Sequence, residues 1–182
     1  AAAFEPSSAQ NARAIAQASA PSVLLLVMED ANGQPLSLGS GFVVREDVIA
    51  TNLHVIGRAS SGYAKLVGQK GKYEVSGIVG LDRVHDLVLL AVRGCAAPSI
   101  PLGDSSAVAV GDEVFVVGNP YGLEGTFSQG IVSGVRNVGP RSLFQITAPI
   151  SPGSSGGPVM NSRGEVVGVA VATFRAGQNL NF

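Results

Sequence analysis

The chain has 182 residues, of which 46% are hydrophobic and 14% charged, and its formal net charge is −1. A chain of this size buries enough apolar surface for one compact domain. The near-neutral charge and the lack of a basic run argue against a nucleic-acid partner, because no cationic surface replaces phosphate counterions. The longest apolar runs, such as 23–28 and 87–92, are far shorter than the ~20 residues that span a bilayer, so we expect no membrane insertion.

Residues 8–20 are rich in Ala and Gln with apolar residues near helical spacing, which predicts one short helix ended by Pro21. Beyond it, short runs of Val, Ile, Leu and Phe alternate with clusters of Gly, Pro, Asn and Asp. This pattern is typical of an all-β barrel or sandwich with about twelve strands. The Pro-containing segment 98–101 divides the strands into two groups. We therefore predict an N-terminal arm and helix at 1–20 and an all-β domain at 21–182.

The only cysteine, Cys95, excludes an intrachain disulfide. It lies in the turn-like segment 93–98, after an apolar run. We interpret it as a small apolar filler rather than a nucleophile.

The segment 153–158, with the sequence GSSGGP, is the strongest candidate for a functional site. Its glycines allow positive-φ backbone and leave main-chain N–H groups open to a substrate carbonyl. Ser155 is then a candidate nucleophile, and the backbone from Gly153 through Ser154 to Ser155 is a candidate oxyanion hole, with the N–H groups of Gly153 and Ser155 as donors. Taken alone, the segment fits a Gly/Ser-rich turn without function equally well, so its partners decide.

A serine nucleophile needs a general base, and the chain contains only two histidines, His54 and His85. His54 follows the apolar run 48–50 and a Thr-Asn step, so we expect it at a strand end near a turn. Lone histidines are more often structural, but this one precedes the candidate nucleophile and has the placement of catalytic groups on a rigid scaffold. His85 is most simply interpreted as a surface residue.

The base in turn needs a carboxylate that fixes its tautomer and stabilises the imidazolium. Asp86 fits because it directly precedes the apolar run 87–92, and a charge at the start of a buried strand needs a partner. Asp82 and Asp104 are the alternatives. The first has the character of a solvated turn residue and the second that of a turn or cap.

The order His, Asp, Ser along the chain is that of the chymotrypsin-like peptidases. The chain resembles the protease domain of the bacterial HtrA/Deg family over nearly its whole length, without a PDZ domain within these residues. Six motifs carry the resemblance: TNLHV at 51–55, DLVLL at 86–90, GDEV at 111–114, GNPYGL at 118–123, GIVS at 130–133 and GSSGGP at 153–158.

This resemblance implies two six-stranded antiparallel β-barrels, at about 21–97 and 102–182, with the active site in the cleft between them. It implies a serine endopeptidase with His54, Asp86 and Ser155 as the triad and with no metal or organic cofactor. Substrates would be unfolded or extended polypeptides, and the location would be periplasmic or otherwise extracytoplasmic in a bacterium. It also implies homotrimers built through the N-terminal segment, which includes Phe4.

Two stretches that wall the specificity pocket in this fold, 143–155 and 166–182, contain no acidic residue, which disfavours a preference for Lys or Arg. We expect cleavage after small or medium aliphatic residues, and main-chain hydrogen bonds from 171–173 to an extended substrate. For Val171, simple core packing is an equally good interpretation. The predicted substrate-binding residues are Pro149, Ile150, Val171, Ala172 and Thr173.

Ser154 stands where the HtrA family usually has Asn and where digestive-type relatives have an Asp that pairs with a new N-terminus. An insertion-type switch is therefore excluded, and control is expected to come from ordering of the oxyanion loop. The alternative function is a catalytically latent protease-fold domain that acts as a chaperone or peptide-binding module. A β-sandwich adhesion module is a weaker alternative.

Overall fold

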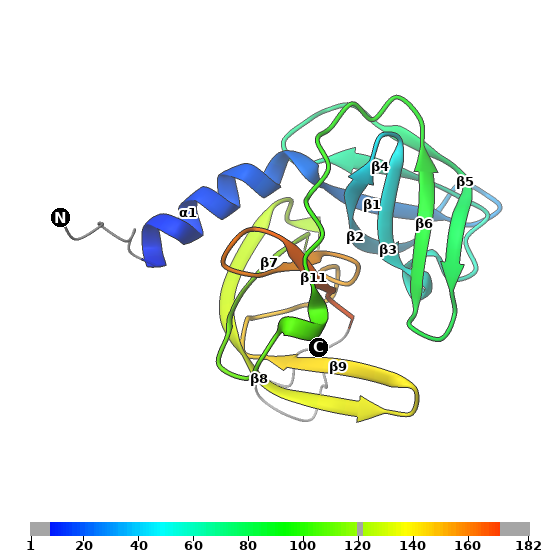
Figure 1. Ribbon diagram of the computed structural model, residues 1–182. Helices are drawn as coiled ribbons and strands as arrows, with labels where there is room; N and C mark the ends of the chain where they lie inside the picture. Colours follow the sequence, from blue (N-terminus) through cyan, green and yellow to red (C-terminus); the bar gives the residue numbers. More distant parts are fainter. Residues whose placement is uncertain (1–7, 120–121, 172–182) are drawn as a thin grey trace.

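The computed structural model describes residues 8–119 and 122–171. The described chain begins with helix α1 (Ser8–Ser19), followed by the short 3-10 helix η1 (Ala20–Ser22). Pro21 lies in η1 and ends the α-helix, because its ring removes the N–H that a continuing helix requires. Ile15 is buried, and Asn11 Nδ2 donates to Ser162 O at 3.0 Å. The helix is therefore packed against the rest of the chain rather than free of it (Figure 1).

Six antiparallel strands close into a barrel in the order β1-β2-β3-β6-β5-β4. Closure leaves no unpaired strand edge in this half of the molecule. The bounds are β1 (Val23–Glu29), β2 (Pro35–Arg45), β3 (Val48–Asn52), β4 (Ser61–Leu66), β5 (Tyr73–Asp82) and β6 (Leu87–Val92).

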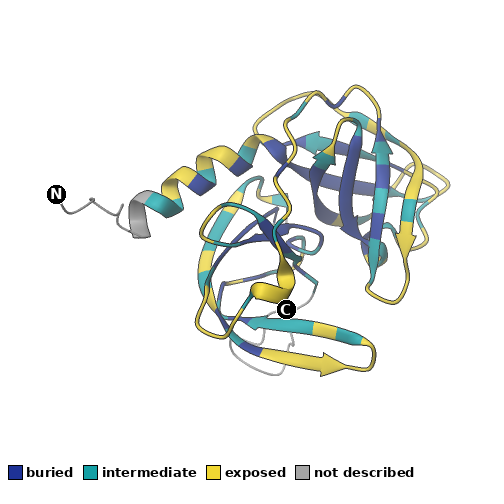
Figure 2. Cartoon of the chain, in the orientation of Figure 1, coloured by how far each residue is buried: buried dark blue, intermediate teal, exposed yellow. Residues whose placement is uncertain are grey.

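The barrel interior is filled by alternate apolar residues of its strands, among them Leu24, Leu26, Ile49 and Leu90. Strand β1 is buried from Val23 to Met28. Leu24, Leu26 and Met28 line the barrel interior, and Val23 packs with residues of the second half. The dark strands of the barrel in Figure 2 show this burial. It explains why the sequence of β1 is a continuous apolar run rather than an alternating one.

The second half is a curled sheet with the order β11-β10-β7-β8-β9 in the described residues. Its strands are β7 (Glu113–Gly118), β8 (Thr126–Val138), β9 (Arg141–Ile146), β10 (Pro158–Met160) and β11 (Val166–Val169). The all-β prediction is confirmed, with one closed six-stranded barrel and one short N-terminal helix. The described residues supply five strands of the predicted second barrel, and residues 172–182 lie outside them.

A shared core joins the two halves. Phe42 and Val23 of the barrel pack with Phe115 and Met160 of the second sheet, and Ile15 of α1 belongs to the same cluster. Phe115 also stacks on Phe127, with ring centroids 5.7 Å apart. Packing of this core fixes the two halves relative to each other and so places the groups that each contributes to the site. Neither of the α-helices described is long and apolar enough to span a membrane.

Candidate active site

The pairing of β3 with β6 brings His54 and Asp86 together. Strand β3 ends at Asn52, which is opposite Leu87, the first residue of β6. His54 is the second residue of the one-turn helix α2 (Leu53–Ile56) that follows β3, rather than a residue of the strand end itself. Its Nδ1 lies 2.5 Å from Asp86 Oδ2, and its backbone N–H donates to Asp86 Oδ1 at 2.9 Å. Because the carboxylate accepts a hydrogen bond from Nδ1–H, the neutral imidazole has its lone pair on Nε2.

The backbone of Asp86 is in the left-handed region, with a φ of 57°. Aspartate is one of the few residues that adopts this conformation readily. The carbonyl of Asp86 accepts hydrogen bonds from Leu53 N at 2.9 Å and Asn52 Nδ2 at 3.1 Å. These contacts tie the Asp86 turn to the start of α2. The Asp86 side chain is 19% exposed and the His54 side chain 46% exposed, so the imidazole is open to a substrate.

The two alternative carboxylates form local structures of their own. Asp82 Oδ2 lies 2.7 Å from His85 Nδ1, and both side chains are about half exposed. The hydrogen bond from His85 holds the pKa of Asp82 below its ordinary value. Asp104 caps the 3-10 helix η2 (Ser105–Ala107), and hydrogen bonds from Ser106 lower its pKa. Neither carboxylate is bonded to His54.

Ser155 lies in the loop between β9 and β10, at the boundary of the two halves. Its Oγ donates to Val171 O at 2.9 Å, and in the described residues no hydrogen bond joins it to His54. Gly153 has a φ of 99°. Within residues 8–119 and 122–171, the N–H groups of Gly153 and Ser155 have no hydrogen-bond partner. Ser154 between them is buried, and its N–H donates to Ser151 O at 2.9 Å.

The second and third glycines of GSSGGP are required by close packing. A Cβ at Gly156 would lie 2.1 Å from Ser40 O and 2.2 Å from Thr51 Oγ1, both in the first barrel. A Cβ at Gly157 would lie 2.2 Å from Val117 O in the second sheet. Only glycine allows the loop to approach both halves this closely.

The predicted substrate-binding residues do not share one environment. Pro149 is exposed, and its carbonyl accepts from Ser128 Oγ. Ile150 is 8% exposed and packs in the core of the second sheet, so it is a core residue rather than an open pocket wall. Val171 lines a cavity of about 460 Å³, whereas Ala172 and Thr173 lie outside the described residues.

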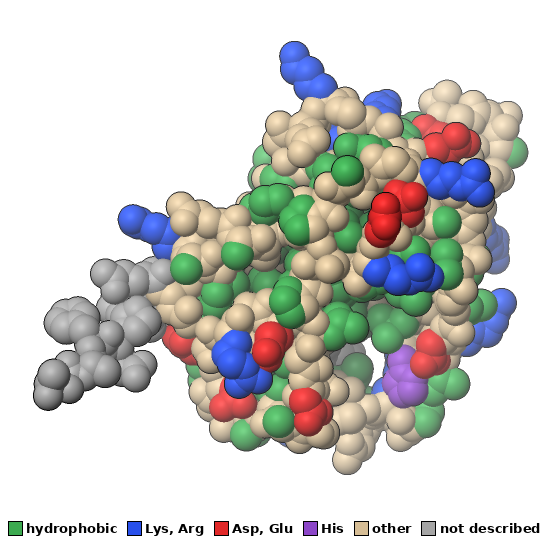
Figure 3. All heavy atoms as spheres, turned by 45° about the horizontal axis from the view of Figure 1, so that its top comes forward, with side chains coloured by type: hydrophobic (Ala, Val, Ile, Leu, Met, Phe, Trp, Pro, Cys, Tyr) green, Lys and Arg blue, Asp and Glu red, His purple; other side chains and the backbone are tan. Residues whose placement is uncertain are grey.

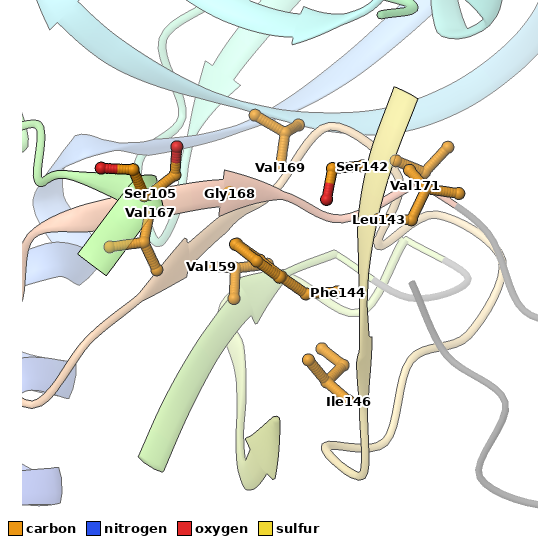
Figure 4. A pocket seen from close by; sticks show the side chains of 11 residues that line it. Ser105, Ser142, Leu143, Phe144, Ile146, Val159, Val167, Gly168, Val169 and Val171 are labelled. Atoms are coloured by element: carbon orange, nitrogen blue, oxygen red, sulfur yellow. The ribbon is translucent and has the colours of Figure 1, made fainter. Parts of the chain in front are cut away.

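That cavity opens between β9 and β11, the two outer strands of the second sheet as described. Its lining is mainly apolar, and Figure 4 shows Phe144 of β9 beside Val159 of β10. Of the hydrogen-bond partners of Ser155, only Val171 lines this cavity. The cavity therefore belongs to the second sheet and is distinct from the group of candidate catalytic residues.

Apart from the candidate catalytic residues, the described chain has few other groups that could act in catalysis or binding. Cys95 is buried, and burial raises the pKa of its thiol, which fits an apolar filler. No group of three or more His, Cys, Asp or Glu side chains that could hold a metal ion occurs in the described ranges. On the face seen in Figure 3, Lys and Arg are scattered among acidic and apolar side chains.

Two polar residues beside the loop were not singled out from the sequence. Ser40 and Asn119 are both fully buried, and Ser40 Oγ donates to Gly153 O at 2.7 Å. The available signal was a polar residue in or directly after an apolar strand, in GSGFVV and in VFVVGN. A fully buried polar side chain must be hydrogen-bonded, but the sequence does not reveal to what.

A family model described as the trypsin-like peptidase domain matches residues 39–169. The chain belongs to this family. Among curated relatives of this trypsin-like peptidase domain, a probable periplasmic serine endoprotease DegP-like of Halomonas elongata is 38% identical over 143 residues, which cover 76% of this chain and 30% of the relative. The magnetosome formation protease MamE of Magnetospirillum gryphiswaldense is 39% identical over 147 residues, covering 76% of this chain and 19% of that protein.

Two solved protease structures have folds similar to that of this chain. The serine endoprotease from Yersinia pestis has a TM-score of 0.80 at 30% identity, over 98% of this chain and 62% of that one. An HtrA-type protease solved with a tripeptide has a TM-score of 0.82 at 26% identity, over 93% of this chain and 57% of that one. The predicted resemblance to HtrA/Deg proteases is confirmed. The chain spans about a third or less of the two curated relatives named above.

The packing at Gly156 leads to a stability prediction. Gly156→Ala should lower the free energy of unfolding by about 3 kcal/mol or more, because a strained positive φ is combined with overlap on two oxygens. The matched control is Gly33→Ala, which has a φ of 74° but no atom within 4 Å of the new Cβ. It should cost only the ~1–2 kcal/mol of the left-handed backbone. Urea unfolding of both variants measures the difference, and equal losses would contradict the packing.

Proposed function

We propose that this trypsin-like domain is a serine endopeptidase of HtrA type that hydrolyses peptide bonds of unfolded or extended polypeptides. The observation that carries the proposal is the 2.5 Å contact of Asp86 Oδ2 with His54 Nδ1. It fixes the ring so that Nε2 faces outward as a base. Ser155 is the nucleophile, and its own backbone N–H and that of Gly153 are the oxyanion donors.

The chemistry follows from these positions. Ser155 Oγ attacks the peptide carbonyl and gives its proton to His54 Nε2, while Asp86 stabilises the imidazolium that forms. The carbonyl oxygen becomes an oxyanion, which the N–H groups of Gly153 and Ser155, on either side of Ser154, stabilise. His54 then protonates the leaving amine, which breaks the C–N bond and leaves an acyl group on Ser155. Water, deprotonated by His54, hydrolyses that ester and returns the enzyme.

The hydrogen bond from Ser155 to Val171 O adds a step before attack. The Ser155 side chain must leave this carbonyl and turn toward His54. An extended substrate that pairs with residues 171–173 uses the same carbonyl as an acceptor for its own N–H. Substrate binding then releases the nucleophile, which couples occupancy of the site to its activation.

The same hydrogen bond supports the second candidate function. A domain whose Ser155 hydroxyl stays on Val171 O binds polypeptide without cutting it, as a chaperone or peptide-binding module. We favour the peptidase because the Asp86–His54 pair has no use in a binding module. The DegP-like relative is named periplasmic, and we propose an extracytoplasmic location for this chain as well.

A fluorophosphonate probe distinguishes the two functions. It should label Ser155, as located by peptide mass mapping, and the label should be lost in Ser155→Ala and in His54→Ala. Asp86→Asn should lower kcat/KM about 10⁴-fold, because the histidine loses the partner that fixes its tautomer. The matched control is Asp82→Asn, which removes the other Asp–His contact in the described residues, and it should leave kcat/KM unchanged.

Two results would count against the peptidase. A chain that binds unfolded protein but takes no label under any condition is a binding module. Equal losses in Asp86→Asn and Asp82→Asn would mean that the 2.5 Å contact has no special role.

We also propose that the residue before the cut bond is small or medium and aliphatic, such as Val, Ala or Leu. The support is the absence of Asp and Glu from 143–155 and 166–182, which leaves no charge for a Lys or Arg side chain. Profiling cleavage of a peptide library measures the preference. A profile dominated by Lys or Arg at that position would refute it.

A further inference from the structure

Ser40 of β2 joins the first barrel to the loop that carries Ser155. It is fully buried, and it lies opposite Leu25 in the pairing of β1 with β2. Its backbone N–H donates to Ser155 O at 2.8 Å, and its Oγ donates to Gly153 O at 2.7 Å. One residue therefore holds the two carbonyl groups on either side of Ser154.

The direction of the Ser40 side-chain hydrogen bond is fixed by Asn119. Asn119 is also fully buried, and both its backbone N, at 2.9 Å, and its Nδ2, at 3.2 Å, donate to Ser40 Oγ. Amide N–H groups only donate, so they occupy the two lone pairs of the hydroxyl. The hydroxyl proton is left for Gly153 O, which only accepts.

The Asn119 side chain is itself held in one orientation. Its Nδ2 donates to Leu24 O at 2.9 Å, and its Oδ1 accepts from Gly125 N at 3.0 Å. Because Leu24 O only accepts and Gly125 N only donates, flipping the amide would break both contacts. The network from Gly125 through Asn119 and Ser40 to Gly153 is thus satisfied along its length, and a satisfied buried network is rigid.

The end of this network is the peptide group between Gly153 and Ser154. Its carbonyl is held by Ser40, and its N–H donates to Ser151 O at 2.9 Å. The peptide lies between the two N–H groups that we assign to the oxyanion hole, those of Gly153 and Ser155. Rotation of this peptide would redirect the loop on both sides, so fixing it aims the two donors before the substrate arrives.

We propose that Ser40 is a positioning residue for the oxyanion hole, and that Asn119 fixes its hydroxyl in the direction that this role needs. The inference rests on the proposed function, since it assigns a support to the donors named there. It places the control of the oxyanion loop partly in the first barrel, which contributes no donor of its own.

Kinetics test the assignment. Ser40→Ala should lower kcat about tenfold or more, a fraction of the ~10²–10³ that loss of a whole oxyanion donor costs. KM should stay within about twofold, because the oxyanion forms only in the transition state. Ser40→Cys has a similar volume and a weak donor, so it should recover part of kcat. It also serves as the second variant if Ser40→Ala does not fold.

The matched control is Ser19→Ala in α1. Ser19 is buried, and its Oγ donates to Ile15 O at 2.7 Å, so the variant loses an equally short bond of the same type away from the loop. Both alanine variants should unfold at a lower temperature than the parent chain. Only Ser40→Ala should lose kcat.

Hydrogen exchange tests the same idea without activity. The amide of Ser154, which is hydrogen-bonded to Ser151 O, should exchange about tenfold faster in Ser40→Ala and at the parent rate in Ser19→Ala. An active parent chain with unchanged kcat and unchanged Ser154 exchange in Ser40→Ala overturns the assignment of Ser40. An inactive parent chain instead counts against the proposed triad, and the exchange experiment then still decides the role of Ser40.

Discussion

The close approach of the GSSGGP loop to β2 is the constraint on which the rest of the site depends. The backbone of the loop lies against Ser40 with no room for a side chain at Gly156. Its main chain is also bonded to the second half, since Gly156 N donates to Ala170 O at 2.8 Å and Ala170 N to Gly157 O at 2.9 Å. The loop is thus clamped between the halves, and Ser155 is carried at their boundary.

This arrangement divides the chemistry between the two sheets. The β3–β6 pairing brings Asp86 and His54 together, and both residues of that contact belong to the closed barrel and its connections. The nucleophile and the oxyanion donors belong to the other half. The two sets meet only because the core around Phe42 and Phe115 fixes the halves relative to each other. A change in that core should therefore affect the distance between base and nucleophile more than the pairing of base and acid.

The fold class and the contact between His54 and Asp86 could be predicted from the sequence because both leave strong local signals. The role of Ser155 as nucleophile stays a prediction. Apolar runs of strand length predict the strands. The glycines of the segment GSSGGP are required where its backbone approaches other backbone closely, so they are recognisable in the sequence. Asp86 is favoured over Asp82 and Asp104 because it directly precedes the apolar run 87–92. The contact itself depends on the register of β3 with β6 and on the positive φ of Asp86, which are properties of the folded chain.

Other features could not be predicted because they depend on long-range contacts. Ile150 is apolar, as the wall of an aliphatic pocket would be, but in the folded chain it packs in the core of the second sheet. Ser40 and Asn119 are 79 positions apart, and nothing in either segment indicates that they share a hydrogen bond. Ser155 was predicted to be the partner of His54, but its hydroxyl donates to Val171 O, which lies just after β11.

The most direct test of the account is a crystal structure of the chain after reaction with a fluorophosphonate. We predict phosphorus bonded to Ser155 Oγ, with a phosphoryl oxygen accepting from the N–H groups of both Gly153 and Ser155. The Val171 carbonyl is then free of the serine side chain, and Ser40 Oγ remains on Gly153 O. An adduct on another residue, or a phosphoryl oxygen turned away from both N–H groups, would contradict it.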